Sequence, residues 1–429
     1  MGKKCILGVL ACVLIFTVSA IAGSAQDKNK KNALYRQVEL FSDALAIIQT
    51  DYVSEVLPKD LIYGALKGML AALDPHSQFM DPETYNELKV DTEGKFGGLG
   101  IEITLQDGLL TVITPIEDTP AWNAGIKAGD HIVKINNELT RDMSLTDAVK
   151  RMRGKPGDPV TLTILRESEK KIMEFKIVRD IIKIKDIKTA KILEDGIAYI
   201  RLVEFRESTD QDMDAALVNL KKEGMNALIL DLRNNPGGLL DAAAAVSEKF
   251  IPKNKIIVST KGRKKSQNME ITSTLNTPIL DCPMVVLINE GSASGSEIVA
   301  GCLQDYKRAI IVGVKSFGKG SVQSVIPLSD GSALRITTSK YFTPLGREIH
   351  GKGVIPDVMV EAGTIESAGK KSGDDSDKEK VEEVFKQVET KEQPQNQPEK
   401  PDFRADNQLS RAVDILKAIK IYKGTAGGA

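Results

Sequence analysis

The sequence predicts a multidomain α/β protein, and three observations support this prediction. Between residues 192 and 360, short apolar runs suited to strands buried on both faces alternate with helical stretches. A purely helical pattern precedes this region, and a segment of short alternating strands lies between the two. With 429 residues, 41% of them apolar, the chain is long enough for two or three domains. Each pattern can therefore belong to a domain of its own.

The N-terminus has the pattern of a secretory signal. Lys3 and Lys4 precede an apolar run over residues 5–22, and small residues follow as far as Ala25. We therefore expect residues 1–25 to be a cleaved signal peptide and the mature protein to lie outside the cytoplasm. The apolar run is short for a membrane span, but its retention as an anchor is an open alternative.

Composition excludes several functional classes. A net charge of −1 and an aromatic content of 5% argue against nucleic-acid binding, which needs a basic face or stacking platforms. Of the four cysteines only Cys282 and Cys302 follow the signal, and we expect small buried residues rather than a disulfide framework. No cluster of His, Cys and Asp has metal-ligand spacing, so the sequence predicts no metal and no cofactor.

Residues 33–90 form the first predicted structural region. Leu40, Leu45 and Ile48 recur at helical spacing, and residues 61–73 repeat the pattern before a turn at Asp74. We expect an N-terminal helical region that serves as a cap or as an oligomerisation arm, so a homo-oligomer is one expectation.

Residues 94–180 have a different character, because a glycine-rich turn runs into alternating strands and one helix. The backbone N–H groups of such a turn can capture the carboxylate of a peptide terminus, and the strand after it can accept an added strand. Together with the run from Pro120 to Asp130, these features resemble a PDZ domain. An ordinary glycine-rich hairpin in a small β domain is the alternative. The expected peptide-binding residues are Phe96, Gly97, Gly98, Leu99, Gly100 and Ile101.

The alternating strands and helices form a predicted core over residues 181–362. Residues 363–402 are rich in Lys, Glu, Gln and Pro, a composition that cannot bury a core and is typical of a flexible linker. Apolar residues then return at helical spacing over residues 403–424, where we expect an amphipathic helix that docks on a domain or on a second subunit. These apolar residues are Leu409, Val413, Leu416 and Ile419.

A Gly/Ser-rich turn that opens an apolar helix contains three serines that are candidates for a nucleophile: Ser292, Ser294 and Ser296. Ser294 lies where the chain enters the helix, so its hydroxyl can project into a cleft beside helix N–H groups that could stabilise an oxyanion. The same residues also match the S-x-x-E capping box, in which the serine only satisfies backbone donors. The pattern does not separate a cap from a nucleophile.

Lys319 is the nearest candidate for a base, because none of the three histidines lies near this turn. The residues before it nearly match a phosphate-binding loop, G-x-x-x-x-G-K-[S/T]. However, Gly320 replaces the required hydroxyl residue, and the segment 321–328 alternates like a strand where a phosphate loop must open a helix.

A second glycine-rich turn, over residues 231–239, also follows a buried strand and opens a helix. Its glycines allow backbone N–H groups to approach a substrate oxygen. We expect Gly237 or Gly238 to face Gly295 and to complete an oxyanion hole; a turn used only for packing is the alternative.

These motifs together resemble the carboxy-terminal processing (tail-specific) proteases, secreted serine peptidases with a Ser–Lys dyad. The resemblance covers residues 33–361 and rests on RNNPGG, NEGSASGSEIVAGCLQD, SFGKGSVQ and HGKGVIPD. It implies a crotonase-like (ClpP-like) protease core with an inserted PDZ domain and an N-terminal helical region. It further implies that Ser294 is the nucleophile, Lys319 the general base and Gln323 the residue that orients the lysine. Glu297 and Asp305 match polar positions near the site without an assigned role.

The resemblance also implies the biology of the site. Substrates would be proteins with exposed, apolar C-terminal tails, captured by the PDZ domain in a bacterial periplasm, with an adaptor or activator protein as a further partner. Arg153 is a candidate for relaying tail binding to the core, although a plain surface role is the alternative. The rival function is a non-catalytic PDZ scaffold that binds protein C-termini.

Overall fold

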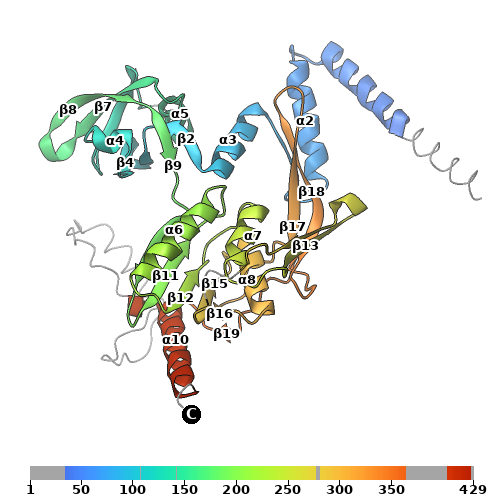
Figure 1. Cartoon of the computed structure of the whole chain (residues 1–429). Helices are drawn as coiled ribbons and strands as arrows, with labels where there is room; N and C mark the ends of the chain where they lie inside the picture. The colour runs from blue at the N-terminus through green and yellow to red at the C-terminus, as the bar shows by residue number, and fades with distance from the viewer. Residues whose placement is uncertain (1–33, 107, 142, 277–280, 364–402, 427–429) are drawn as a thin grey trace, which may run out of the picture. The chain divides into compact units, whose positions relative to one another are not determined.

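The computed structural model describes residues 34–106, 108–141, 143–276, 281–363 and 403–426. The expected signal peptide and nearly all of the expected linker therefore lie outside the described residues. The described chain divides into two units, residues 1–81 with 325–336 and the remainder, and each is considered by itself. Figure 1 shows the elements of both.

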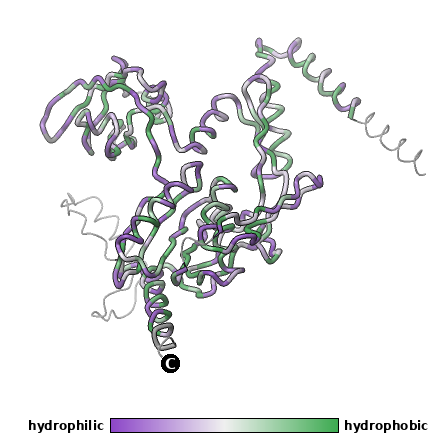
Figure 2. The backbone as a smooth tube through the Cα atoms, viewed as in Figure 1, coloured by the Kyte–Doolittle hydropathy of each residue, from purple (hydrophilic) through white to green (hydrophobic). Residues whose placement is uncertain are grey.

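The first unit is mainly helical. Residues 34–51 form one helix, α2 (Pro58–Ala71) forms a second, and β1 (Gln78–Met80) pairs antiparallel with residues 333–335. Tyr63 of α2 packs on Phe79, with ring centroids 4.7 Å apart. Its hydroxyl donates a hydrogen bond of 2.8 Å to Asp330. Many large apolar side chains remain exposed along residues 34–73. Figure 2 colours the hydrophobic residues of the chain green.

A five-strand path, β3-β4-β5-β7-β8, forms the sheet of the predicted PDZ region, with β6 paired to β5. Alternate residues of its strands are buried in one cluster that includes Leu162 and Ile164. The edge strand β3 lies close to α5. The elements are β3 (Ile101–Gln106), β4 (Leu109–Pro115), α4 (Pro120–Asn123), β5 (His131–Ile135), β6 (Glu138–Leu139), α5 (Leu145–Met152), β7 (Pro159–Arg166) and β8 (Lys171–Val178).

One part of the expected glycine-rich turn is a strand instead. α3 (Pro82–Glu93) is followed directly by β2 (Lys95–Gly98), which pairs antiparallel with β9 (Asp180–Lys183). The turn is thereby reduced to Leu99 and Gly100, the latter with a φ of 77°. Composition alone favoured a turn because glycine is frequent there, but pairing with a strand more than 80 residues away decided the local structure.

The core contains a six-stranded sheet in the order β10-β11-β12-β15-β16-β19. β10 runs antiparallel to β11, and the other neighbours are parallel. The elements are β10 (Ile187–Ile192), β11 (Ile197–Leu202), α6 (Thr209–Lys222), β12 (Ala227–Asp231), α7 (Leu240–Glu248), β15 (Met284–Ile288), α8 (Gly295–Asp305), β16 (Ile310–Gly313) and β19 (Val358–Met359).

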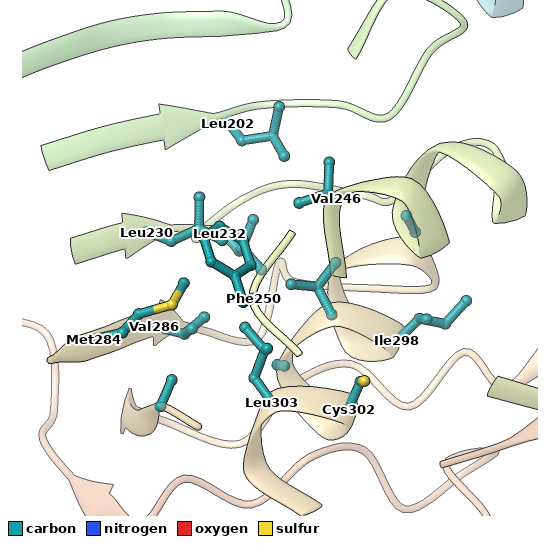
Figure 3. Packing of buried hydrophobic residues seen from close by; sticks show 14 of the residues in the cluster. Leu202, Leu230, Leu232, Val246, Phe250, Met284, Val286, Ile298, Cys302 and Leu303 are labelled. Atoms are coloured by element: carbon teal, nitrogen blue, oxygen red, sulfur yellow. The ribbon is translucent and has the colours of Figure 1, made fainter. Parts of the chain in front are cut away.

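Both faces of this sheet are buried, which explains the unbroken apolar runs in the sequence. One face packs against α6, α7 and α8, and Figure 3 shows Leu230, Val246 and Cys302 meeting there around Phe250. The other face packs against α10 (Asn407–Ala426), whose Leu409, Val413 and Leu416 are buried among strand residues. The C-terminal helix thus docks on the core of its own chain. A short helical turn, η3 (Phe403–Ala405), precedes α10.

A second sheet completes the core. β13 (Ile256–Gly262) pairs with β14 (Met269–Thr272) and with β18 (Ala333–Phe342), and β17 (Ser321–Pro327) also pairs with β18. A single helical turn, η2 (Lys265–Gln267), lies between β13 and β14. The expected hairpin at residues 329–332 joins β17 and β18.

Parallel strands bring the chemistry-bearing turns together. β11, β12, β15 and β16 point the same way, so their carboxyl ends share one edge of the sheet, where α/β proteins usually bind ligands. The turns that follow these strands include the RNNPGG turn after β12 and the Gly/Ser-rich turn with Ser294 after β15. The segment after β16 leads to Lys319.

A buried ion pair holds the PDZ region together. The Arg166 guanidinium donates to both oxygens of the Asp130 carboxylate, at 2.7 and 2.8 Å, and to the Gly125 carbonyl at 2.9 Å. Both side chains are more than nine-tenths buried. Breaking such a pair leaves an uncompensated buried charge.

We therefore predict that Asp130→Ala lowers the free energy of unfolding of this region by about 3–5 kcal/mol. The measurement is urea denaturation followed by the fluorescence of Trp122, the one tryptophan of the chain, which lies on α4 in the same region. Asp158→Ala, at an exposed position of the same region, is the control and should shift the transition little. Equal transitions for the two variants would contradict the prediction.

Candidate active site

Ser294 has a backbone conformation that few residues other than glycine adopt. Its φ is 51° and its ψ is −111°, and it lies at the N-cap of α8, directly after the turn that follows β15. Such conformations cost free energy and persist where the surrounding structure holds them, most often at functional sites. The strain marks Ser294 as the residue of this turn to consider first.

The other two serines of the turn have structural roles. Ser292 and Ser296 are completely buried. The Ser292 hydroxyl donates to the Leu232 carbonyl at 2.8 Å, and the Ser296 hydroxyl donates to the Asn235 carbonyl at 2.9 Å. Both hydroxyls therefore fasten this turn to the RNNPGG turn. Ser294, which is partly exposed, remains as the candidate nucleophile.

Two asparagines, which the sequence analysis did not single out, join the two turns. The Asn235 carbonyl accepts from the N–H of Ala293 at 3.0 Å, and its side chain donates to the Leu202 carbonyl at 3.0 Å. The Asn289 side-chain oxygen accepts from the N–H of Asn234 at 2.8 Å. In the sequence, the only sign of this role is that each asparagine follows a buried strand. Because asparagine is common in turns, that sign is weak.

The RNNPGG turn lies directly against Ser294. A Cβ atom placed on Gly237 would lie 2.6 Å from the Ser294 Cβ and 2.7 Å from the Gly295 nitrogen, so only glycine fits here. Gly237 also has a φ of 102°. The structure thus brings Gly237 to the side of Ser294 and Gly295, and Gly238 is the next residue of the same turn.

The hydrogen bonds of this turn distinguish its glycines. The Gly237 N–H donates to the side-chain oxygen of Asn235 at 2.8 Å. Gly295 is the first residue of α8, whose N–H has no partner within the helix. Phe205, which follows β11, donates to the Gly237 carbonyl at 2.9 Å and pairs with Gly238, which fixes the turn from its other side.

Lys319 lies in the segment between β16 and β17, and the structure removes the phosphate-loop alternative. The residues after Lys319 form the strand β17. A phosphate loop would open a helix there.

A single carboxylate connects Ser294 with Lys319. The backbone N–H groups of both residues donate to the same oxygen of Glu297, at 2.8 Å from Ser294 and 2.9 Å from Lys319. The two backbone nitrogens are therefore no farther apart than the sum of these distances. The second oxygen of Glu297 accepts from the Gly318 N–H at 2.7 Å and the Ser316 hydroxyl at 2.6 Å.

Glu297 is completely buried. Burial raises the pKa of its carboxyl, and the hydrogen bonds from Ser316, Gly318, Ser294 and Lys319 offset only part of that effect. Of the capping box expected from S-x-x-E, the half that Glu297 supplies is present: its carboxylate accepts the Ser294 N–H, whereas the Glu297 N–H donates to the Ser294 carbonyl at 2.9 Å. Its role was left unassigned by sequence; here it holds the segment 316–319 against the start of α8.

The remaining expected residues lie at different distances from this centre. The Gln323 side chain, at the start of β17, donates to the hydroxyls of Ser321 at 2.9 Å and Thr337 at 3.4 Å. Asp305 ends α8, so it lies about 15 Å along the helix axis from Ser294. It binds Arg347 and the Leu345 N–H there, which is a structural role.

A buried network links the RNNPGG turn to the C-terminal helix. Asp231 ends β12 and accepts from the Tyr199 hydroxyl at 2.8 Å and from the Arg233 guanidinium at 2.7 Å. The same guanidinium donates to Asp406 and to Gln408 at 3.0 Å. Residues that begin α10 therefore support the turn that carries Gly237 and Gly238.

In the PDZ region, Arg153 contacts the expected peptide-binding residues. Its guanidinium carbon lies 4.5 Å from the centre of the Phe96 ring, a cation–π geometry. The next residue, Gly154, donates its N–H to the Gly97 carbonyl at 3.1 Å. A Cβ atom on Gly97 would lie 2.0 Å from the Gly154 carbonyl oxygen, so the two segments are in close contact.

The two cysteines of the described chain differ in burial, since Cys282 is half-buried and Cys302 is buried. Cys302 is completely buried in α8, and burial raises the pKa of its thiol to about 12. Cys282 and Cys302 do not form a disulfide in the part of the chain that the structure describes. Among the helices that the structure describes, none is both long and apolar enough to cross a membrane.

Comparison with known proteins identifies three regions. Residues 196–360 match the family model of peptidase family S41. Residues 111–166 match a PDZ domain, and residues 16–84 match the N-terminal domain of the activating protease CtpB.

Two curated relatives match most of the chain. A carboxy-terminal-processing protease of Bartonella bacilliformis is 45% identical over 365 residues, covering 84% of this chain and 83% of its own. The carboxy-terminal processing protease CtpB of Bacillus subtilis is 32% identical over 354 residues, covering 82% and 73%. Among solved structures, a photosystem II D1 C-terminal processing protease matches at 30% identity and a TM-score of 0.43, covering 75% of this chain and 92% of its own.

The bonds to Glu297 predict a strong effect of a small change. In Glu297→Gln an amide NH₂ replaces one carboxylate oxygen and faces donors, so two buried donors lose their acceptor. We expect the free energy of unfolding to fall by about 2–4 kcal/mol, measured by urea denaturation with circular dichroism at 222 nm. Glu290→Gln makes the same change at an exposed position seven residues earlier and should leave the transition unchanged. Indistinguishable transitions would contradict the proposed contacts.

The Arg233 network predicts a pH dependence. Burial opposes ionisation of Asp406, but its bonds with Arg233 outweigh burial, and the pKa of this carboxyl is lowered. A lowered carboxyl pKa contributes stability that is complete above the ordinary value of about 4 and is lost as the pH falls below it.

We therefore expect Asp406→Asn to be less stable than the parent at pH 7, with a difference that shrinks as the pH falls below about 4. Urea midpoints measured across this range test the expectation. Asp414→Asn, on an exposed face of the same helix, provides the control. A stability difference that is independent of pH would refute it.

Proposed function

Because the chain belongs to the carboxy-terminal processing proteases of peptidase family S41, we propose that it is a serine endopeptidase in which Ser294 is the nucleophile and Lys319 the general base. One observation carries this proposal. Glu297 binds the backbone of both residues through one oxygen, so a strained serine and a lysine 25 residues further along the chain are held in one place.

The proposed reaction needs only these two side chains and backbone donors. Lys319, as the neutral amine, accepts the proton of the Ser294 hydroxyl while the oxygen attacks the substrate carbonyl. The resulting ammonium then gives its proton to the leaving amine, which frees the C-terminal fragment and leaves an acyl-enzyme. A water molecule then attacks the ester while Lys319 takes one of its protons. The ester C–O bond breaks, Lys319 returns the proton to the Ser294 oxygen, and the N-terminal fragment leaves with a new carboxyl terminus. Gln323, the third residue of β17, is proposed to orient the amine.

The oxyanion of the tetrahedral intermediate requires backbone donors beside Ser294. We assign Gly295 and Gly238 to this role, since the N–H of Gly237 already donates to Asn235. Gly237 contributes by the absence of a side chain, because any Cβ there would collide with Ser294 and Gly295.

Substrates are proposed to be proteins with exposed, apolar C-terminal tails. The PDZ domain would bind the terminus through residues 96–101, with β3 as the edge strand to which an extended peptide adds. Arg153 touches Phe96 and is placed to respond to occupancy of this site. The match of residues 16–84 to the N-terminal domain of an activating protease suggests that a regulatory partner protein or a second copy also binds.

The expected signal and the family both favour action outside the cytoplasm, in a bacterial periplasm, with the N-terminal run cleaved or kept as an anchor. The alternative function, a PDZ scaffold without catalysis, is less favoured because both dyad residues are present in the expected motifs.

Two substitutions test the dyad. We expect Ser294→Ala and Lys319→Ala each to lower kcat for cleavage of an unfolded protein at least about 10³-fold, because each removes a group that acts in the transition state. Lys315→Ala, an exposed lysine of the same segment, should keep parental activity. Peptide release is measured by mass spectrometry, with tail binding measured in parallel. Parental cleavage by both dyad variants would refute the assignment. A parent that binds tails and never cleaves would establish the scaffold function.

A further inference from the structure

Tyr341 contacts the backbone of both proposed dyad residues. It lies on β18, paired with Thr260 of β13, and only 1% of its surface is exposed. Its hydroxyl donates to the Ser294 carbonyl at 3.1 Å and is also in hydrogen-bond contact with the Lys319 carbonyl. Its backbone N–H donates to the Gly320 carbonyl at 3.0 Å. One residue of a neighbouring strand therefore holds both Ser294 and the Lys319 segment.

Tyr341 and Glu297 act on opposite ends of the same two residues. One carboxylate oxygen of Glu297 accepts the N–H groups of Ser294 and Lys319, and one phenol oxygen of Tyr341 faces their two carbonyls. Any sliding of the Lys319 segment along α8 would leave a buried polar group without its partner, which is unfavourable. The two side chains together restrict both the spacing and the rotation of these peptide units.

The Tyr341 phenol is suited to act as a hydrogen-bond donor that does not ionise. Burial raises the pKa of Tyr341 well above its ordinary value, and the nearby Glu297 carboxylate adds to this effect. The hydroxyl therefore stays protonated over the working range of a protein. Its proton faces main-chain carbonyls, which leaves Tyr341 no direct part in the proton transfers of the reaction.

We propose that Tyr341 is a positioning residue that sets the separation between the Ser294 hydroxyl and the Lys319 amine. The inference rests on the proposed Ser–Lys function. Reacting groups must be held within a fraction of an ångström, and a misplacement of about 1 Å can cost about 10²-fold in rate. Sequence motifs could not identify this role, because the three residues come from a strand, the segment before another strand, and the start of a helix.

Tyr341→Phe removes only the hydroxyl and is the direct test. We expect kcat to fall about 10- to 100-fold while KM stays at the parental value, since peptide binding does not use this group. Tyr306→Phe is the matched control, because that hydroxyl also donates to a main-chain carbonyl, that of Ile256 at 2.9 Å, in the same core. The control should keep the parental kcat. An unchanged kcat in Tyr341→Phe, or an equal loss in both variants, would overturn the proposal.

Two further measurements separate positioning from folding and from the proposed function. Incorporation of 4-aminophenylalanine at position 341 keeps a weaker donor and should give a kcat between those of Tyr341→Phe and the parent. If Tyr341→Phe does not fold, the 4-aminophenylalanine variant is tested in its place. A parental kcat in the 4-aminophenylalanine variant would then overturn the proposal.

Hydrogen exchange of residues 316–320 reports positioning without any need for catalysis. We expect faster exchange in Tyr341→Phe than in Tyr306→Phe, and equal exchange would overturn the inference. A parent that shows no cleavage refutes the proposed protease function, while the exchange result still decides whether Tyr341 positions the Lys319 segment.

Discussion

The buried carboxylate of Glu297 is the interaction on which the site depends. A carboxylate that is removed from water must receive hydrogen bonds from the protein, and here every bond comes from residues 294 and 316–319. Because the buried Glu297 carboxylate requires these hydrogen bonds, it fixes the positions of two separate backbone segments. The fold supplies the remainder by ending four parallel strands at one edge, so that short turns reach the same region from different parts of the sequence.

Local conformation at Ser294 follows from this arrangement. An isolated turn would relax from a φ of 51°, but Ser294 is fixed by Glu297 at its N–H, by Tyr341 and the first turn of α8 at its carbonyl, and by Gly237 beside its Cβ. Strain at this residue is therefore maintained by three neighbours from different elements. Nucleophilic serines of the G-x-S-x-G type occupy a similar sharp turn between a strand and a helix.

Sequence patterns could predict the regions and the helices and strands that carry the motifs. The apolar runs of β11, β12 and β15 and the hairpin between β17 and β18 have strong local signals, because burial and turn chemistry are both local. The chain's PDZ region and family could also be inferred from motifs, and the comparisons confirm both. The S-x-x-E pattern was ambiguous between a cap and a functional turn. In the structure the Glu297 carboxylate accepts the Ser294 N–H, as in a capping box, and also binds the Lys319 segment, so the two interpretations do not exclude one another.

Contacts between distant segments could not be predicted in this way. Phe96, Gly97 and Gly98 have turn composition, yet pairing with β9 makes them a strand. Tyr341 looks like any buried strand residue in the sequence. Arg233 looks like a surface charge near a turn, yet its partners Asp231 and Asp406 are 175 residues apart in the sequence. Only the tertiary structure shows which polar groups it brings together.

The Arg233 network determines how late in synthesis the RNNPGG turn gains its full set of contacts. A ribosome makes the RNNPGG turn long before it makes Asp406 and Gln408, which supply two of the partners of Arg233. Until those residues emerge, the guanidinium next to the turn lacks these partners and one face of the central sheet lacks the cover of α10. α10, which is synthesised after all of these motifs, is therefore among the elements that complete the site, and a chain released before α10 would carry every motif of the site without its full support.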